Sequence, residues 1–294
     1  MTDQYEPQPD QPDQPDQPDQ PDQPDQPARS ASGFPATGRR VLVTGASRGL
    51  GRELARAFAR NGDRVAVHYG TRREDAEETL AALPGEGHVL ATADVSQPAE
   101  AARLAEEAAD ALGGLDVLVN NAAVNFPHPP ASTSYDDWTT AWRRHTDVNL
   151  LGTAHLSHQA AQRMIAQGAA GGDQEGHGGR IVNIGSRGAF RGEPDHPAYA
   201  ATKAAVHALG QSLAVALAPY GIAVASVAPG FFETERVAHR LRGEEGAAIR
   251  AQSPYGRVGR PEEVAEAVLW LASPAAEWSS GAVLDLNGAS YLRT

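Results

Sequence analysis

The sequence predicts an α/β fold with one doubly wound parallel sheet of about seven strands, flanked by helices and preceded by a disordered N-terminal tail. Two observations support this prediction. From Arg39 onward, short β-branched runs alternate with long Ala-rich stretches of helical periodicity, the pattern of strand–helix–strand units that feed a parallel sheet. The runs at 41–43, 117–119 and 222–227 are almost entirely apolar, as strands buried on both faces require.

The expected elements follow one another in this order along the chain. Strands are expected at 40–44, 64–69, 88–92, 115–119, 180–185, 222–228 and 282–286. Helices are expected at 49–61, 73–82, 97–112, 136–168, 198–218 and 261–272. Residues 167–179 are Gly-rich and polar, which predicts a flexible surface loop. Residues 231–256 have weak periodicity, which fits either a mobile lid over a pocket or a helical excursion without function.

The first 37 residues differ in composition from the rest of the chain. The triplet Gln-Pro-Asp repeats six times between residues 8 and 25. Frequent proline removes backbone donors and repeated aspartates repel one another, so little there offsets the entropy lost on ordering. We therefore expect a disordered tail at 1–37 and a folded domain at 38–294. The tail is either a solvated extension or an arm that binds a partner.

Composition excludes several classes of function. The net charge is −12, but the tail holds eight acidic residues and one basic residue, which leaves 29 acidic and 24 basic residues elsewhere. That balance lacks the clustered Lys and Arg on which binding to nucleic acid or an anionic membrane depends. The chain has no cysteine and its histidines are scattered, so we expect no metal site. Without a signal or anchor pattern, we expect a cytoplasmic protein.

A glycine-rich turn follows the first expected strand. Residues 44–51 read Thr-Gly-Ala-Ser-Arg-Gly-Leu-Gly and open a helical pattern. The glycines allow the backbone to turn sharply and approach a pyrophosphate, while the helix amino terminus offers N–H groups and a positive dipole end. In this strand-to-helix context the spacing predicts a dinucleotide site. The alternative is a turn that only begins a helix.

The end of the second strand predicts which dinucleotide binds. Enzymes that prefer NAD usually end this strand with an acidic residue that accepts from the ribose hydroxyls. Here the strand ends at Tyr69, and the nearest acids lie inside the next helix. Arg48, Arg72 and Arg73 are instead expected near a 2′-phosphate, which a guanidinium binds well. We therefore expect NADP(H), mainly because of Arg48, since Arg72 and Arg73 also fit a solvated helix start.

Tyr199 and Lys203 lie four residues apart in an Ala-rich segment, which places both on one helix face. Reduction of a ketone needs an acid for the developing alkoxide, and a free tyrosine with a pKa near about 10 matches neutral pH poorly. Lowering this pKa to about 7 requires roughly 4 kcal/mol. An ammonium about 4 Å away supplies energy of that order at an effective dielectric near about 20.

Two further polar residues lie near the expected catalytic pair. Ser186 follows an apolar strand at the carboxyl edge of the sheet, where ligands bind in open α/β folds. Its hydroxyl can donate to a substrate carbonyl. Asn149 lies inside a long expected helix, where its amide either bonds to water or backbone, or marks a cap or kink.

Eight short motifs along the folded part carry a resemblance to a known family. They are 44–51, Asp94 with Val95, 120–123, Asn149, Ser186, Tyr199 with Lys203, 229–234 and 285–288. In this combination and order, residues from about Arg39 to Leu292 resemble the classical short-chain dehydrogenase/reductases, most closely their 3-oxoacyl-[acyl-carrier-protein] reductase branch. Two positions depart from the pattern: Ala123 stands where glycine is usual, and Ala225 where asparagine is frequent.

The resemblance implies a Rossmann-type fold and a catalytic tetrad. Asn149 would hold a water, Ser186 orient the carbonyl, Tyr199 donate the proton, and Lys203 lower the pKa of Tyr199 and bind the nicotinamide ribose. The implied cofactor contacts are Gly45, Ser47, Arg48, Gly49, Leu50, Gly51, Asp94, Val95, Asn121, Tyr199, Lys203, Phe232 and Thr234. The resemblance also implies a homotetramer joined through the helices at 136–168 and 198–218 and the carboxyl end.

The sequence therefore predicts an oxidoreductase that reduces a ketone, of 3-oxoacyl or related type, with NADPH. One alternative is oxidation of a sugar, steroid or other secondary alcohol by the same residues in reverse. Another is a dinucleotide sensor, which needs the glycine turn but not Ser186, Tyr199 and Lys203 together. An acyl-carrier partner would need basic side chains at the pocket mouth, for which the candidates are Arg187, Arg191, Arg236, Arg240 and Arg242.

Overall fold

The computed structural model describes residues 38–171, 178–234, 237–238 and 240–293. One sheet of seven parallel strands forms its centre, in the order β3-β2-β1-β4-β5-β6-β7. The strands are β1 Arg40–Val43, β2 Arg64–Tyr69, β3 Val89–Thr92, β4 Val117–Asn120, β5 Arg180–Ile184, β6 Ala223–Pro229 and β7 Val283–Leu286. The strand order reverses between β1 and β4, so the predicted doubly wound sheet is confirmed. The expected tail at 1–37 lies outside the described residues.

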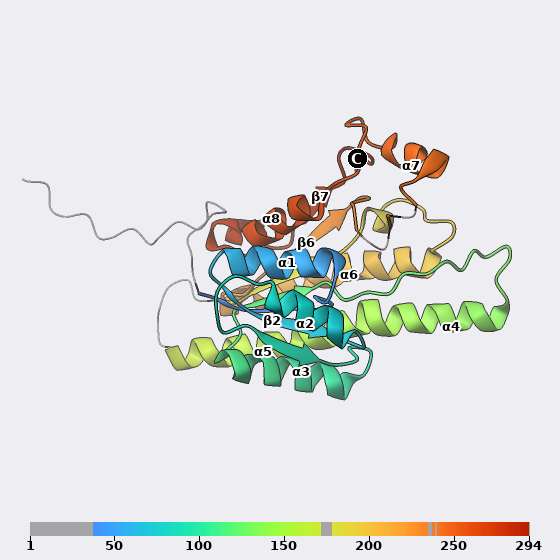
Figure 1. Ribbon diagram of the computed structural model, residues 1–294. Helices are drawn as coiled ribbons and strands as arrows, with labels where there is room; N and C mark the ends of the chain where they lie inside the picture. Colours follow the sequence, from blue (N-terminus) through green and yellow to red (C-terminus); the bar gives the residue numbers. More distant parts are fainter. Residues whose placement is uncertain (1–37, 172–177, 235–236, 239, 294) are drawn as a thin grey trace, which may run out of the picture.

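Helices cover both faces of the sheet (Figure 1). They are α1 Gly49–Arg60, α2 Arg73–Ala81, α3 Pro98–Leu112, α4 Tyr135–His145, α5 Gly152–Gly171, α6 Pro197–Leu217, α7 Gly243–Arg250 and α8 Pro261–Leu271. Helices α1, α2 and α8 pack on one face, and α3, α5 and α6 on the other. Among the described residues, no helix is long and apolar enough to cross a membrane.

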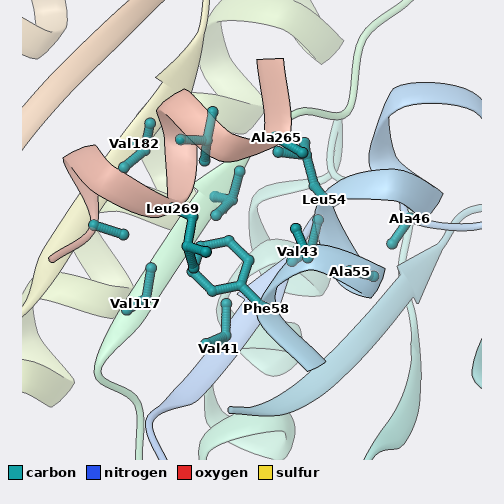
Figure 2. Packing of buried hydrophobic residues seen from close by; sticks show 14 of the residues in the cluster. Val41, Val43, Ala46, Leu54, Ala55, Phe58, Val117, Val182, Ala265 and Leu269 are labelled. Carbon is teal, nitrogen blue, oxygen red and sulfur yellow. The ribbon is translucent and has the colours of Figure 1, made fainter. Parts of the chain in front are cut away.

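Successive side chains of each strand point to opposite faces of the sheet, so the strands contribute to two hydrophobic cores, one on each face. Val41 and Val43 of β1 pack beneath α1 and α8, whereas Leu42 between them faces α3 and α5. Phe58 of α1 is fully buried, and Figure 2 shows its ring between Leu269 of α8 and Val41 of β1. Burial of such a side chain stabilises the fold by about 1.5–3 kcal/mol. This packing fixes α1 against β1, and with it the glycine turn between them.

The long helix expected at 136–168 is present, but it contains a π-helical turn that the sequence did not predict. Helices α4 and α5 are separated by a π-helical turn, Thr146–Leu151, which contains Asn149. Asn149 is buried, and its amide bonds to the backbone of Val124 rather than to its own helix. Apolar spacing does not reveal such a turn, because it adds one residue without breaking the helical pattern.

The two connections described as irregular in the sequence are partly helical. Segment 231–256 contains a helix, α7, in agreement with one of its two expected alternatives, and a Cβ on Gly246 would overlap the Leu241 carbonyl. The expected loop at 167–179 is shorter at its start, because α5 continues to Gly171. Residues 172–177, 235–236 and 239 of these two segments lie outside the described part of the chain.

Candidate active site

A cavity of about 870 Å³ lies along the carboxyl edge of the sheet. Its lining comes from the ends of six strands, β1 to β6, around Gly45, Gly70, Asp94, Asn121, Ser186 and Phe232, and from Tyr199 and Lys203 of α6. Ligands of open α/β sheets bind outside the carboxyl ends of the strands, at the point where the strand order reverses. The predicted cofactor and catalytic residues line this cavity except Asn149 and, among the arginines expected near a 2′-phosphate, Arg73.

The glycine turn forms a cradle at one end of the cavity. Gly45 and Gly49 adopt positive φ angles of 63° and 55°, which side chains disfavour. A Cβ on Gly51 would overlap the Gly45 carbonyl. No side chain of a described residue caps α1, so its first N–H groups remain available to a ligand. An exposed helix amino terminus behind a close backbone turn fits a pyrophosphate.

His68 holds this turn in place, a role that no sequence pattern indicated. Its Nδ1 accepts a hydrogen bond from the Gly45 N–H at 3.0 Å, and its Nε2 donates to the Ala93 carbonyl at 3.1 Å. The side chain is buried, and burial lowers its pKa to about 4. A neutral imidazole therefore joins the ends of β1, β2 and β3.

The arginines predicted near a 2′-phosphate differ in their placement. Arg48 and Arg72 line the cavity, whereas Arg73 does not. Arg72 lies 3.4 Å from Asp75, and Arg73 lies 2.8 Å from Glu77, both on α2. Within the described residues, Arg48 makes no ion pair. Arg48 is therefore the guanidinium best able to take an added phosphate.

Asn121 supports the cradle from the end of β4. Its Nδ2 donates to the carbonyls of Thr44 and Gly45 at 2.8 and 3.1 Å, and the Thr44 hydroxyl accepts from its backbone N–H at 2.9 Å. Asp94 and Val95 follow β3, and Phe232 and Thr234 follow β6; all four line the cavity, and Thr234 lies next to Gly49 of the glycine turn. The amide of Asn121 thus ties β4 to β1 directly behind the glycine turn.

Three side chains of the predicted tetrad meet at the other end of the cavity. The Lys203 Nζ donates to the Ile184 carbonyl at 2.6 Å and lies 5.8 Å from the centroid of the Tyr199 ring. Lys203 is only 4% exposed, so its charge is shielded from bulk water. Ser186 Oγ accepts from the Gly188 N–H at 3.0 Å, which leaves its own hydrogen for another acceptor.

Asn149 is buried and does not itself line the cavity. Its Oδ1 accepts from the Val124 N–H at 2.8 Å, and its Nδ2 donates to the Val124 carbonyl at 3.0 Å and lies 3.3 Å from the Thr202 hydroxyl. Its own carbonyl accepts from the Thr153 hydroxyl at 2.8 Å. The amide therefore joins the loop after β4 to α6, near Tyr199.

A second buried histidine, His128, supports α6. Its Nε2 accepts from the Ala198 N–H at 3.0 Å, at the first turn of α6, and its Nδ1 donates to the Phe126 carbonyl at 2.9 Å. His145 lies 5.0 Å from it between ring centroids and 6.5 Å from Tyr199. Burial lowers the pKa of His145. The contact with Ala198 joins residues 70 apart in the chain, so no local motif could have found it.

The comparisons with known proteins agree with this geometry. A family model described as Enoyl-(Acyl carrier protein) reductase matches residues 45–288. Cis-4-hydroxycyclohexanecarboxylate dehydrogenase of Sinomonas cyclohexanicum is 38% identical over 252 residues, 85% of this chain and 95% of that protein. The 3-oxoacyl-[acyl-carrier-protein] reductase of Vibrio cholerae serotype O1 is 33% identical over 255 residues, 87% of this chain and 98% of that protein.

Solved structures show the same similarity. A short chain dehydrogenase from Burkholderia cenocepacia J2315, in complex with NADP, superposes with a TM-score of 0.76 at 31% identity. The match covers 87% of this chain and 98% of that one. Together with the seven-stranded sheet and the residues on its carboxyl edge, these matches show that the chain belongs to the classical short-chain dehydrogenase/reductase family.

Proposed function

We propose that this chain is an NADP(H)-dependent oxidoreductase that reduces a ketone to a secondary alcohol, with Tyr199 as the proton donor. One observation carries the proposal: Ser186, Tyr199 and Lys203 line the same cavity as the uncapped amino terminus of α1. A dinucleotide sensor requires the uncapped amino terminus of α1 but not the three side chains. An enzyme requires both, because hydride transfer and proton transfer must occur at one substrate carbonyl.

The glycine turn and the end of the cavity that holds Lys203 would bind different parts of the cofactor. The glycine turn and the α1 amino terminus bind the pyrophosphate. Phe232 and Thr234 would hold the nicotinamide carboxamide, with Thr234 also next to Gly49 of the turn, and Lys203 would bind the ribose beside it. When bound there, the cofactor supplies the hydride that the carbonyl carbon accepts.

Side chains of this protein stabilise and then neutralise the negative charge that develops on the substrate oxygen. The Ser186 hydroxyl, already bonded to the Gly188 N–H, donates its hydrogen to the carbonyl oxygen. Tyr199 transfers its phenolic proton to the same oxygen as it becomes an alkoxide. The buried Lys203 ammonium, anchored on Ile184, favours the phenolate that remains. Preorganised groups of this kind need no reorientation during the reaction.

The preference for NADP(H) rests on Arg48. Its side chain lines the cavity and makes no ion pair within the described residues, and β2 ends without an acidic residue. A 2′-phosphate gains charge-assisted hydrogen bonds from such a guanidinium. The similar Burkholderia structure, which contains NADP, supports the proposal.

The same residues catalyse the reverse reaction, oxidation of a secondary alcohol. The Sinomonas relative, named as a dehydrogenase, favours this as a second candidate, whereas the Vibrio relative, named as a reductase, favours carbonyl reduction. The test follows the absorbance of reduced nicotinamide with 3-oxoacyl thioesters, simple ketones, diketones and quinones, and then in reverse with the matching alcohols. Turnover of ketones with NADPH supports the proposal. Cofactor binding without turnover on any carbonyl or alcohol would instead indicate the sensor.

A further inference from the structure

Arg187 directly follows Ser186 and lies in the cavity wall. The residue is 4% exposed. Its Nη1 donates to the Ser290 hydroxyl at 2.6 Å and its Nη2 to the Gln252 Oε1 at 3.0 Å, and both of these acceptors are neutral. Among the described residues, no carboxylate lies within ion-pair distance of it. A buried charge without a counter-charge is costly, so its retention indicates that something else neutralises it.

The surroundings of Arg187 contain charges of both signs, but none of the described carboxylates is in contact with its guanidinium. Arg191 donates to the same Gln252 Oε1 at 3.0 Å. Burial first, and the charge of Arg191 second, lower the pKa of Arg187, while Glu193 acts in the opposite direction. Glu193 and Asp195 also line the cavity, but neither forms an ion pair with Arg187. Arginine stays protonated in proteins even so.

A second guanidinium is already neutralised. Arg240 and Arg187 lie over the same Phe231 ring, 5.6 and 5.3 Å from its centroid. Arg240 pairs with Glu245 of α7 at 2.8 Å. Arg187 is therefore the guanidinium beside Ser186 that lines the cavity without a carboxylate partner among the described residues; Arg191, which forms no ion pair either, does not line the cavity. The one charge of Arg187 matches a carboxylate better than a phosphate, which carries nearly two charges.

We propose that Arg187 binds a carboxylate of the substrate, and that the substrate is an oxo acid, or the corresponding hydroxy acid in reverse. The inference rests on the proposed function, because Ser186 marks the end of the cavity at which the carbonyl binds. Arg187 lines the same cavity as Ser186, so it can offer the substrate a second contact there. Two of its N–H groups hold Ser290 and Gln252, and the planar fork has further N–H groups for a carboxylate.

The test compares charged and neutral forms of one substrate. We would measure kcat/KM for 4-oxopentanoate and 4-oxocyclohexanecarboxylate, each against its methyl ester, in the wild type, Arg187→Gln and Arg191→Gln. Arg191→Gln is the matched control, because it removes the same charge from a residue that shares the Gln252 acceptor but does not line the cavity.

We expect the wild type to prefer the acid, and Arg187→Gln to lower the acid-to-ester ratio about ten- to hundredfold, mainly through KM. Arg191→Gln should keep this ratio within about threefold. The dissociation constant for NADPH should be unchanged in both variants. A wild-type ratio near one, or a ratio that survives Arg187→Gln, would overturn the inference and leave the reductase proposal intact.

Two further measurements separate the possible failures. If no carbonyl is turned over, the proposed function fails, and protection of the NADPH complex against thermal unfolding by acid or ester then tests Arg187 alone. Equal protection by both would overturn the carboxylate site. If Arg187→Gln does not fold, Arg187→Lys keeps the charge without the planar fork, and it should retain part of the preference for the acid. No loss of preference in Arg187→Lys would contradict bidentate binding.

Discussion

The Lys203 ammonium donates a 2.6 Å hydrogen bond to the carbonyl of Ile184, the last residue of β5. This contact joins helix α6 to the strand end from which Ser186 follows two residues later. It also holds the Lys203 Nζ 5.8 Å from the centroid of the Tyr199 ring. One buried charge thereby links the strand end that precedes Ser186 to the helix that carries Tyr199, the two groups proposed to act on the substrate oxygen.

Lys203→Met should lower kcat about a hundredfold or more, in the range that general acid catalysis contributes. The variant loses the ammonium beside Tyr199 and the bond to Ile184. Steady-state kinetics with a turned-over ketone, together with thermal unfolding, would check this. A folded Lys203→Met protein with near wild-type kcat would remove Lys203 from the chemistry.

Arg48→Glu should weaken NADPH binding about tenfold or more and change NADH binding little, because it replaces a phosphate-binding charge by a repelling one. Equilibrium titration of both cofactors measures this. The matched control is Arg73→Glu, since Arg73 pairs with Glu77 and does not line the cavity. Equal affinities for the two cofactors in the wild type would contradict the assignment of NADP(H).

His128→Leu should lower stability by about 0.5–2 kcal/mol, as expected for loss of a helix amino-terminal cap, because the Ala198 N–H loses its acceptor. It should also lower kcat, since Tyr199 is the next residue of α6. His128→Gln can return an oxygen to the position of Nε2 and should recover part of both losses. Urea unfolding and kcat, measured for both variants, test this. An equal loss of kcat in both would argue that the ring itself, not its acceptor, matters.

Acid should destabilise the protein through His68. Burial lowers its folded pKa to about 4, below the unfolded value of about 6.5, so the unfolded state binds the proton first. The stability that neutral His68 contributes is therefore present above pH of about 6.5 and falls toward pH of about 4, by up to about 1.4 kcal/mol per pH unit. His207, whose pKa burial also lowers to about 4, adds to the same slope. Urea unfolding of His68→Gln across this range should show a smaller slope than the wild type, and an unchanged slope would contradict the neutral imidazole.

The sheet was predictable because its strands are short apolar runs such as 41–43, separated by helices with clear periodicity. The π turn at Thr146–Leu151 was not, since the spacing of apolar residues continues through it. A helix such as α7 was one of two alternatives for 231–256, since the weak periodicity there did not decide between a lid and a helical excursion. The amide contact between Asn149 and Val124 is tertiary, and the local spacing of residues does not show it.

Some residues of the candidate site could be proposed from the sequence and others could not. Residues such as Gly45 and Tyr199 could be proposed from the sequence because the spacing of their motifs is tied to one strand or one helix. His68 and His128 were missed, because each acts through a hydrogen bond to a distant backbone N–H. The uncompensated charge of Arg187 emerges only when burial and partners are known.

Tyr199→Phe tests the central claim most directly. It removes the phenolic proton and keeps the ring, which lies 6.5 Å from the His145 ring between centroids. With a ketone that the wild type reduces, NADPH oxidation should fall about a hundredfold or more, while the dissociation constant for NADPH stays within about threefold. Retained turnover at the wild-type rate, in a variant that still binds NADPH, would contradict the assignment of Tyr199 as the proton donor.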